Sequence, residues 1–122
     1  MLRSVKLHQV VVNSSTSEDI RDLWKACLLS FEEPAPEFLE LWNRGLYTHV
    51  ATMRFDEEDP IDPVVLNRAF GESQEGNMTC HSKFARSAST GDILEYDEQF
   101  YFVLGQGFQN VTDQFMSVKM KN

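Results

Sequence analysis

The stretch ILEYDEQFYFVLGQGF, residues 93–108, constrains the fold of this chain more than any other feature. Ile93 to Tyr96 and Gln99 to Leu104 are two strand-like runs, and the acidic pair between them has the length of a tight hairpin turn. Alternation divides the second run into two rows of side chains, Phe100, Phe102 and Leu104 in one and Tyr101 and Val103 in the other. The sequence therefore predicts an antiparallel hairpin, followed at Gly105 to Phe108 by a second turn into a short strand ending at Val111.

The N-terminal part of the chain predicts a strand and then a helix. Ser4 to Val12 is strand-like, and the polar loop after it ends in a helix start, with Thr16 as N-cap and Asp19 at the capping-box position. Apolar residues then recur at helical spacing, at Ile20, Leu23, Trp24, Cys27, Leu28 and Phe31. The prolines of the following sequence EEPAPE end this helix, because proline lacks a backbone donor.

A second helix is expected after the prolines, with an apolar face and a stop at Gly45. Its apolar face comprises Phe38, Leu41, Trp42 and Leu46. Because the connection between the two helices is short, we expect them to form a helical hairpin.

The next segment alternates as a strand, which would place five side chains on one face: Tyr47, His49, Ala51, Met53 and Phe55. An acidic loop, DEEDPID, leads to a short helix with Asp62 as N-cap and Pro63 at its first position. That helix would carry Val65, Leu66, Ala69 and Phe70. Residues 71–83 are polar and predict a loop, and Met116, Val118 and Met120 alternate weakly in the tail.

Together these elements predict an α+β fold in a single domain, residues 1–122. A small antiparallel sheet, open or partly closed, would carry the N-terminal helical hairpin and one short helix. No apolar run reaches the length of a signal peptide core or a membrane span, so we expect a cytoplasmic protein. In that compartment Cys27 and Cys80 would be reduced thiols.

The net charge of −8 is concentrated in one third of the chain. Residues 31–62 hold nine acidic residues and only two basic ones, Arg44 and Arg54. Direct binding to nucleic acid needs clustered lysine and arginine, so this class of function is disfavoured. A protein partner with a basic surface fits the charge better.

The acidic segment is therefore the candidate partner site. On the second helix Glu33, Glu37 and Glu40 would lie on one side, at i, i+4 and i+7, as a row of carboxylates facing a basic cleft. Trp42 and Tyr47 are the candidate aromatic hot spots. The loop adds Asp56, Glu57, Glu58 and Asp59. The alternative is a solvated acidic face without a partner.

The sequence does not predict a metal site, a cofactor or a catalytic centre. Cys80 and His81 are adjacent, but the paired and repeated ligands of structural zinc are missing. Ser89 and Thr90 lie near Asp92, yet a nucleophile and its base must converge in space, and sequence neighbours rarely do. His49 is expected to be a buried or half-buried, hydrogen-bonded histidine rather than a ligand or base.

The segment ARSASTGDILEYDEQFYFVLGQGF resembles a motif of small proteins from phages and other mobile elements. The matching residues are Arg86, Ser87, Ser89, Gly91, Asp92, Tyr101, Val103, Gly107 and Phe108, and LNRAF at 66–70 resembles a short helix upstream of the motif. The resemblance covers the C-terminal half and departs at Ala88 and Thr90, where Met or Thr and then Val are expected. It implies a mobile-element origin and a compact sheet, not an activity. Residues 89–92 are expected to form a turn, with Arg86 pairing with Asp92 or capping a carbonyl.

These observations lead to three hypotheses of function. The first is a small acidic phage-type accessory protein that binds a host protein in the host cytoplasm and inhibits or redirects it. The second is a structural or assembly component of a virion, or another homo-oligomer. The third is a small enzyme, which would need a pocket holding His49, Cys80 or His81 beside other titratable groups.

Overall fold

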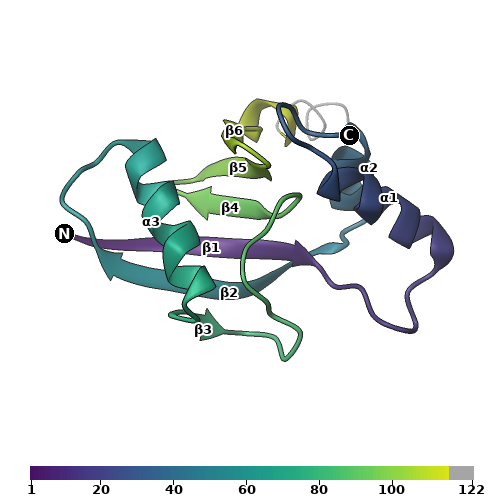
Figure 1. Ribbon diagram of the computed structural model, residues 1–122, viewed down its shortest axis with the longest axis horizontal. Helices are drawn as coiled ribbons and strands as arrows, with labels where there is room; N and C mark the ends of the chain where they lie inside the picture. The colour runs from purple at the N-terminus through teal and green to yellow at the C-terminus, as the bar shows by residue number, and fades with distance from the viewer. Residues whose placement is uncertain (116–122) are drawn as a thin grey trace.

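The computed structural model describes residues 1–115, which contain one open, six-stranded antiparallel sheet (Figure 1). Its strand order is β3-β2-β1-β4-β5-β6. The strands are β1 (Leu2–Val10), β2 (Tyr47–Asp56), β3 (Thr79–Cys80), β4 (Ile93–Tyr96), β5 (Gln99–Leu104) and β6 (Gly107–Asn110). The tail residues Met116, Val118 and Met120 lie outside the described residues.

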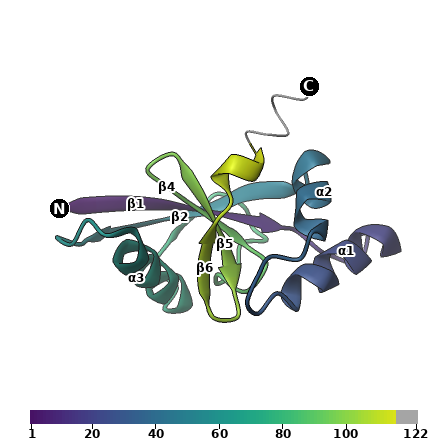
Figure 2. The same ribbon diagram turned by 90° about the horizontal axis from the view of Figure 1, so that it is seen from above.

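Three helices lie between the strands in sequence, α1 (Glu18–Leu28), α2 (Glu37–Asn43) and α3 (Asp62–Gln74), and a single helical turn spans residues 112–115. Helix α3 covers one face of the sheet, whereas α1 and α2 lie toward the far end of the molecule's long axis (Figure 2). The predicted α+β class, with a helical hairpin and a further helix packed on an antiparallel sheet, is confirmed. No helix within residues 1–115 is long and apolar enough to cross a membrane.

The predicted hairpin of residues 93–104 has the expected turn and the expected faces. Asp97 and Glu98 have φ values of 54° and 63°, as a two-residue turn of type I′ requires. Leu94, Tyr101 and Val103 belong to the core under α3, together with Val65, Leu66 and Ala69. Ile93, Phe102 and Leu104 belong to the core under α1 and α2, together with Cys27, Phe38 and Leu41. The two faces of this hairpin thus contribute side chains to two different cores.

Strand β2 differs from the prediction at its centre. Leu7 pairs with Ala51, but the next residue, His8, pairs with His49, so Val50 is an extra residue in β2. This β-bulge reverses the alternation. Tyr47 and His49 therefore lie on the face opposite to Ala51, Met53 and Phe55, and the prediction of one shared face was wrong.

Local hydrogen bonds also move the helix starts. The N-cap of α1 is Ser17, whose hydroxyl accepts from the amide of Ile20 at 3.3 Å. The hydroxyl of Thr16, the predicted cap, accepts from the amide of Asn13 at 2.9 Å and closes the preceding loop instead. Helix α3 begins at Asp62 itself, whose carboxylate accepts from the hydroxyl of Tyr101.

Two further boundaries correct the predictions. Helix α2 begins only at Glu37, because the segment before it contains Pro34 and Pro36, so Glu33 precedes the helix. Helix α3 continues to Gln74, and strand β3 follows, so the predicted loop of residues 71–83 contains regular structure at both places.

Candidate functional site

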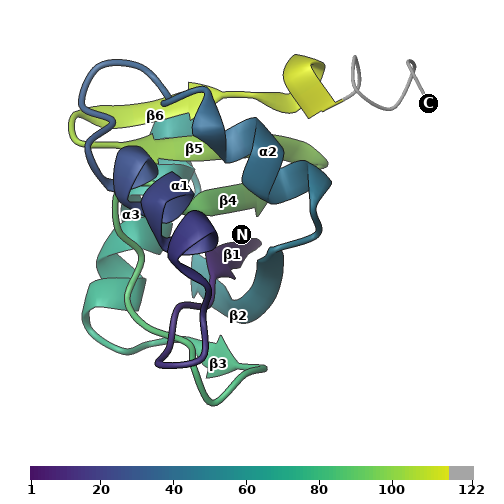
Figure 3. The ribbon, with the colours of Figure 1, turned by 90° about the vertical axis from the view of Figure 1, so that its right-hand side faces the viewer.

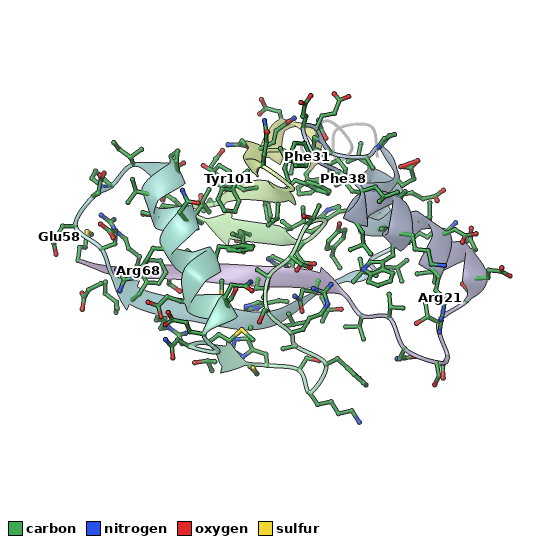
Figure 4. All side chains as sticks on the ribbon, viewed as in Figure 1. Arg21, Phe31, Phe38, Glu58, Arg68 and Tyr101 are labelled. Carbon is green, nitrogen blue, oxygen red and sulfur yellow. The ribbon has the colours of Figure 1, made fainter. Side chains whose placement is uncertain are left out.

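The predicted acidic site is divided between the two ends of the molecule. Glu37 and Glu40 lie on α2, whereas Asp56 to Asp59 follow the far end of β2. β2 contains ten residues and therefore spans roughly 30 Å. Figure 4 shows Glu58 at the end of the molecule opposite to Phe38 of α2. Acidic residues that are close in sequence are thus two separate surfaces.

The loop of residues 56–59 makes several contacts inside the protein. Glu57 lies 3.7 Å from Arg68 of α3, and its backbone carbonyl accepts from Arg3 at 3.0 Å. Glu58 accepts from the α-amino group of Met1, which lowers the pKa of this carboxyl. Asp59 accepts from the amide of Ile61 at 3.0 Å. These carboxylates join the ends of β1, β2 and α3, so they have local structural roles.

The carboxylates near α2 do not form a row. Glu40 lies 3.6 Å from Arg44, which also donates to Asp19 at 2.7 Å. One carboxylate oxygen of Glu37 is buried without a hydrogen-bond partner in residues 1–115. Burial, and second the Glu37 charge, raises the pKa of the Cys27 thiol to about 12. Glu33 and Glu40 are exposed, and Glu33 precedes the helix.

Trp42 and Tyr47 hold α2 against the sheet. The indole of Trp42 stacks on Phe115 with ring centroids 4.1 Å apart, and its centroid lies 5.6 Å from that of the Tyr47 ring. The Tyr47 hydroxyl donates to the carbonyl of Gly91 at 2.7 Å, and burial raises the pKa of this phenol. Because these rings pack and form hydrogen bonds inside the protein, we look for the aromatic and apolar contacts of a partner at other residues.

The motif of residues 86–92 builds a buried polar network around one carboxylate. Asp92 accepts from both terminal nitrogens of Arg86, at 3.1 and 3.2 Å, and from the side chain of Gln9 and the amide of Ser89, both at 2.9 Å. Gly91 has a φ of +95°, and a Cβ atom there would lie 3.2 Å from the Cβ atom of Cys27. The sequence STGD is thus a turn, as predicted, and Arg86 pairs with Asp92.

The three histidines lie on the sheet face opposite to α3. His8 contacts Glu95 at 2.9 Å, while His49 and His81 each contact the hydroxyl of Thr52 at 2.9 Å. The predicted hydrogen bond of His49 is therefore present. Cys80 pairs in the sheet with Ala51, and no group of three or more His, Cys, Asp or Glu within residues 1–115 is arranged to hold a metal ion.

Exposed apolar side chains mark a surface that the sequence did not predict. Leu29 is 83% exposed, Phe31 57% and Phe84 49%, and Leu28 is exposed beside them. Leu28, Leu29 and Phe31 end α1 and begin the connection to α2, whereas Phe84 belongs to the loop before β4. Figure 3 shows this loop beside α1. Large apolar side chains gathered on a surface are typical of interaction sites.

These side chains border two cavities along α1, which we call together the α1 groove. The first cavity, about 290 Å³, is lined by Trp24, Phe84, Arg86, Gln9 and Val10 to Val12. The second, about 250 Å³, is lined by Leu28 to Phe31, Thr90 and Gly105. The two cavities have no lining residue in common, but each has one wall on α1 and another on the loop before β4, since Trp24 and Leu28 are one helical turn apart and Arg86 and Thr90 belong to that loop.

The charges around the α1 groove are unequal at its two ends. At one end Glu32 and Glu33 are exposed directly after Phe31. At the other end Lys83 lies over the ring of Phe84 at 5.2 Å. The groove can therefore bind apolar side chains and favour positive charge beside Phe31.

Comparisons of the chain with family models, with curated proteins and with solved structures gave no match.

The α1 groove was not predicted from the sequence because Leu28 and Phe31 continue the apolar spacing of α1 and resemble core residues. The sequence feature that could have indicated the groove is Leu29, which lies on the opposite side of the helix from the apolar face. A helix that buries one side cannot cover both Leu28 and Leu29.

Proposed function

We propose that the protein is a non-enzymatic binding module that captures a basic segment of a partner protein in the α1 groove. The supporting observation is the concentration of exposed apolar side chains. Seven large apolar residues are exposed within residues 1–115, and four of them, Leu28, Leu29, Phe31 and Phe84, border this groove. Fully burying one large apolar side chain contributes about 1.5–3 kcal/mol, so covering these partly buried side chains contributes less than that each.

The charge distribution supports a basic partner segment. Glu32 and Glu33 favour lysine or arginine beside the apolar residue that contacts Phe31, and the net charge of −8 speeds the approach of a basic protein. The apolar anchors supply affinity, while the exposed carboxylates supply orientation and salt dependence. The loop of residues 56–59 has no part in this contact.

The resemblance to proteins of phages and mobile elements suggests an origin, and the acidic surface beside exposed apolar side chains suggests a binding role. We propose an accessory protein that binds a host protein in the host cytoplasm and inhibits or redirects it. An assembly component is the second hypothesis, and it predicts that the groove is filled by another copy of this chain.

The test compares three immobilised proteins in host lysate. Wild type and the Leu2→Ser control should retain the same basic protein at about 50 mM salt and less of it at about 300 mM. Leu29→Ser should lose it, because Leu29 borders the groove and Leu2 does not. Both side chains are well exposed, at 83% and 66%, so neither change removes core packing.

Two results would contradict the proposal. Equal retention by Leu29→Ser and Leu2→Ser would exclude the α1 groove as the site. Stable dimers of the purified wild type that dissociate on Leu29→Ser, measured by sedimentation, would favour the assembly hypothesis instead.

A further inference from the structure

The three histidines of the chain form one row across neighbouring strands. His8 lies on β1, His49 on β2 and His81 directly after β3. The ring centroids of His8 and His49 are 5.4 Å apart, and those of His49 and His81 are 4.7 Å apart. Three segments that are far apart in sequence thus place three imidazole rings side by side.

The hydroxyl of Thr52 links two of these rings. Thr52 is 4% exposed, and its oxygen lies 2.9 Å from Nε2 of both His49 and His81. A hydroxyl donates one hydrogen, so it can donate to one ring while the other ring donates to it. For the hydroxyl hydrogen to be bonded to one of these rings, at least one of the two Nε2 atoms must be unprotonated. If both rings are charged, the buried hydroxyl hydrogen loses its acceptor and two cations lie side by side.

The surroundings favour the neutral forms of His49 and His8. Burial, then the charges of His8, His81 and Lys6, lowers the pKa of His49. Burial also lowers the pKa of His8, although the contact with Glu95 of β4 opposes this. His8 also lies against the uncharged rings of Trp42 on α2 and Phe100 on β5, and the charge of Lys6 further lowers its pKa.

The contact of the Thr52 hydroxyl with His49 and His81 lies beside a short edge strand, β3. β3 has two residues, paired with Ala51 and Thr52, and the amide of His81 adds one bond to the carbonyl of Val50 at 2.7 Å. So short a strand depends on side-chain contacts for its attachment. The chain then continues to Phe84, a wall of the α1 groove.

We propose that His49, Thr52 and His81 form a proton-sensitive clasp that fastens β3 to β2. The clasp is closed while at least one of the two rings is neutral. Protonation of the second ring opens it, and the segment around residues 79–81 leaves the sheet edge while the remaining strands stay paired. An effect on partner binding would rest also on the proposed function, so the test observes β3 directly and uses no partner.

The experiment measures amide hydrogen exchange of His81 by NMR between pH 7.5 and 5.0, with each rate divided by the intrinsic rate at that pH. Opening linked to one proton should reduce the protection of this amide by about tenfold per pH unit below the pKa of the opened ring, roughly 6.5. The amides of the β4–β5 hairpin should keep their protection.

Two variants separate the clasp from general acid instability. Gln at position 81 can donate or accept but does not titrate, so His81→Gln should keep much of the protection at pH 7.5 and lose its pH dependence. His8→Gln, the matched control in the same row, should keep the pH dependence at His81. Unchanged wild-type protection between pH 7.5 and 5.0, or the same pH dependence in His81→Gln, would overturn the proposal.

Discussion

Replacing Arg86 with Met tests whether a buried charge pair holds the loop that forms one wall of the α1 groove. Methionine keeps the apolar stem but leaves the Asp92 carboxylate, 3% exposed, without its cation. Removing one member of a buried ion pair costs about 3–5 kcal/mol. Because Arg86 is itself 38% exposed and partly screened by water, we expect a loss of about 2–3 kcal/mol at pH 7.

The pH dependence of this loss has a definite sign. Burial raises the pKa of Asp92, and the Arg86 guanidinium opposes that rise. Without Arg86 the pKa of the folded protein rises further above that of the unfolded chain. Such a carboxyl contributes stability below the unfolded pKa, about 3.9, and that contribution is lost as the pH rises through the folded pKa. The deficit of Arg86→Met should therefore shrink as the pH is lowered from 7.

Urea unfolding of wild type, Arg86→Met, Asp92→Asn and the double variant, at pH 7 and pH 5, measures these free energies. The double variant should be less destabilised than the sum of the single ones, because it leaves no unpaired buried carboxylate. A deficit of Arg86→Met that stays below about 1 kcal/mol and does not change with pH would refute the reasoning.

Three further predictions concern packing and titration. Gly91→Ala should lower the free energy of unfolding more than Gly76→Ala, since both glycines have positive φ but only a Cβ atom at 91 meets Cys27, and equal losses in urea titrations would count against this. Trp42→Ala should cost about 3 kcal/mol through loss of its stack on Phe115, and a thermal midpoint within a degree of wild type would show that the contact is dispensable. Because the pKa of His49 is lowered in the fold, wild type should lose stability as the pH falls below about 6.5, and His49→Gln should show a shallower loss in urea titrations at pH 7.5, 6.5 and 5.5.

The parts of the fold that follow local patterns were predictable from the sequence. The hairpin of residues 93–104 combines strict alternation with a two-residue turn, so its strands, turn and faces agree with the prediction. The bulge at Val50 was not predictable, because alternation alone does not reveal where a strand carries an extra residue without a partner. One residue there moved His49 to the other face, where it meets His8 and His81.

The candidate site was less predictable, because it depends on distances between segments. The acidic residues on either side of β2 are neighbours in sequence and are separated in space by the length of that strand. Trp42 and Tyr47 resembled exposed hot spots, yet they pack on Phe115 and bond to Gly91. The α1 groove forms only when α1 meets the loop before β4, a contact that no local pattern encodes.

Site-specific photo-crosslinking tests the central claim most directly. A photoreactive phenylalanine analogue placed at position 29, beside the α1 groove, or at position 2, far from it, is activated in a cell lysate at low salt. The account predicts that a basic protein is crosslinked from position 29 but not from position 2, and that its yield falls as the salt is raised. Equal yields from both positions, or crosslinks only to an acidic protein, would contradict it.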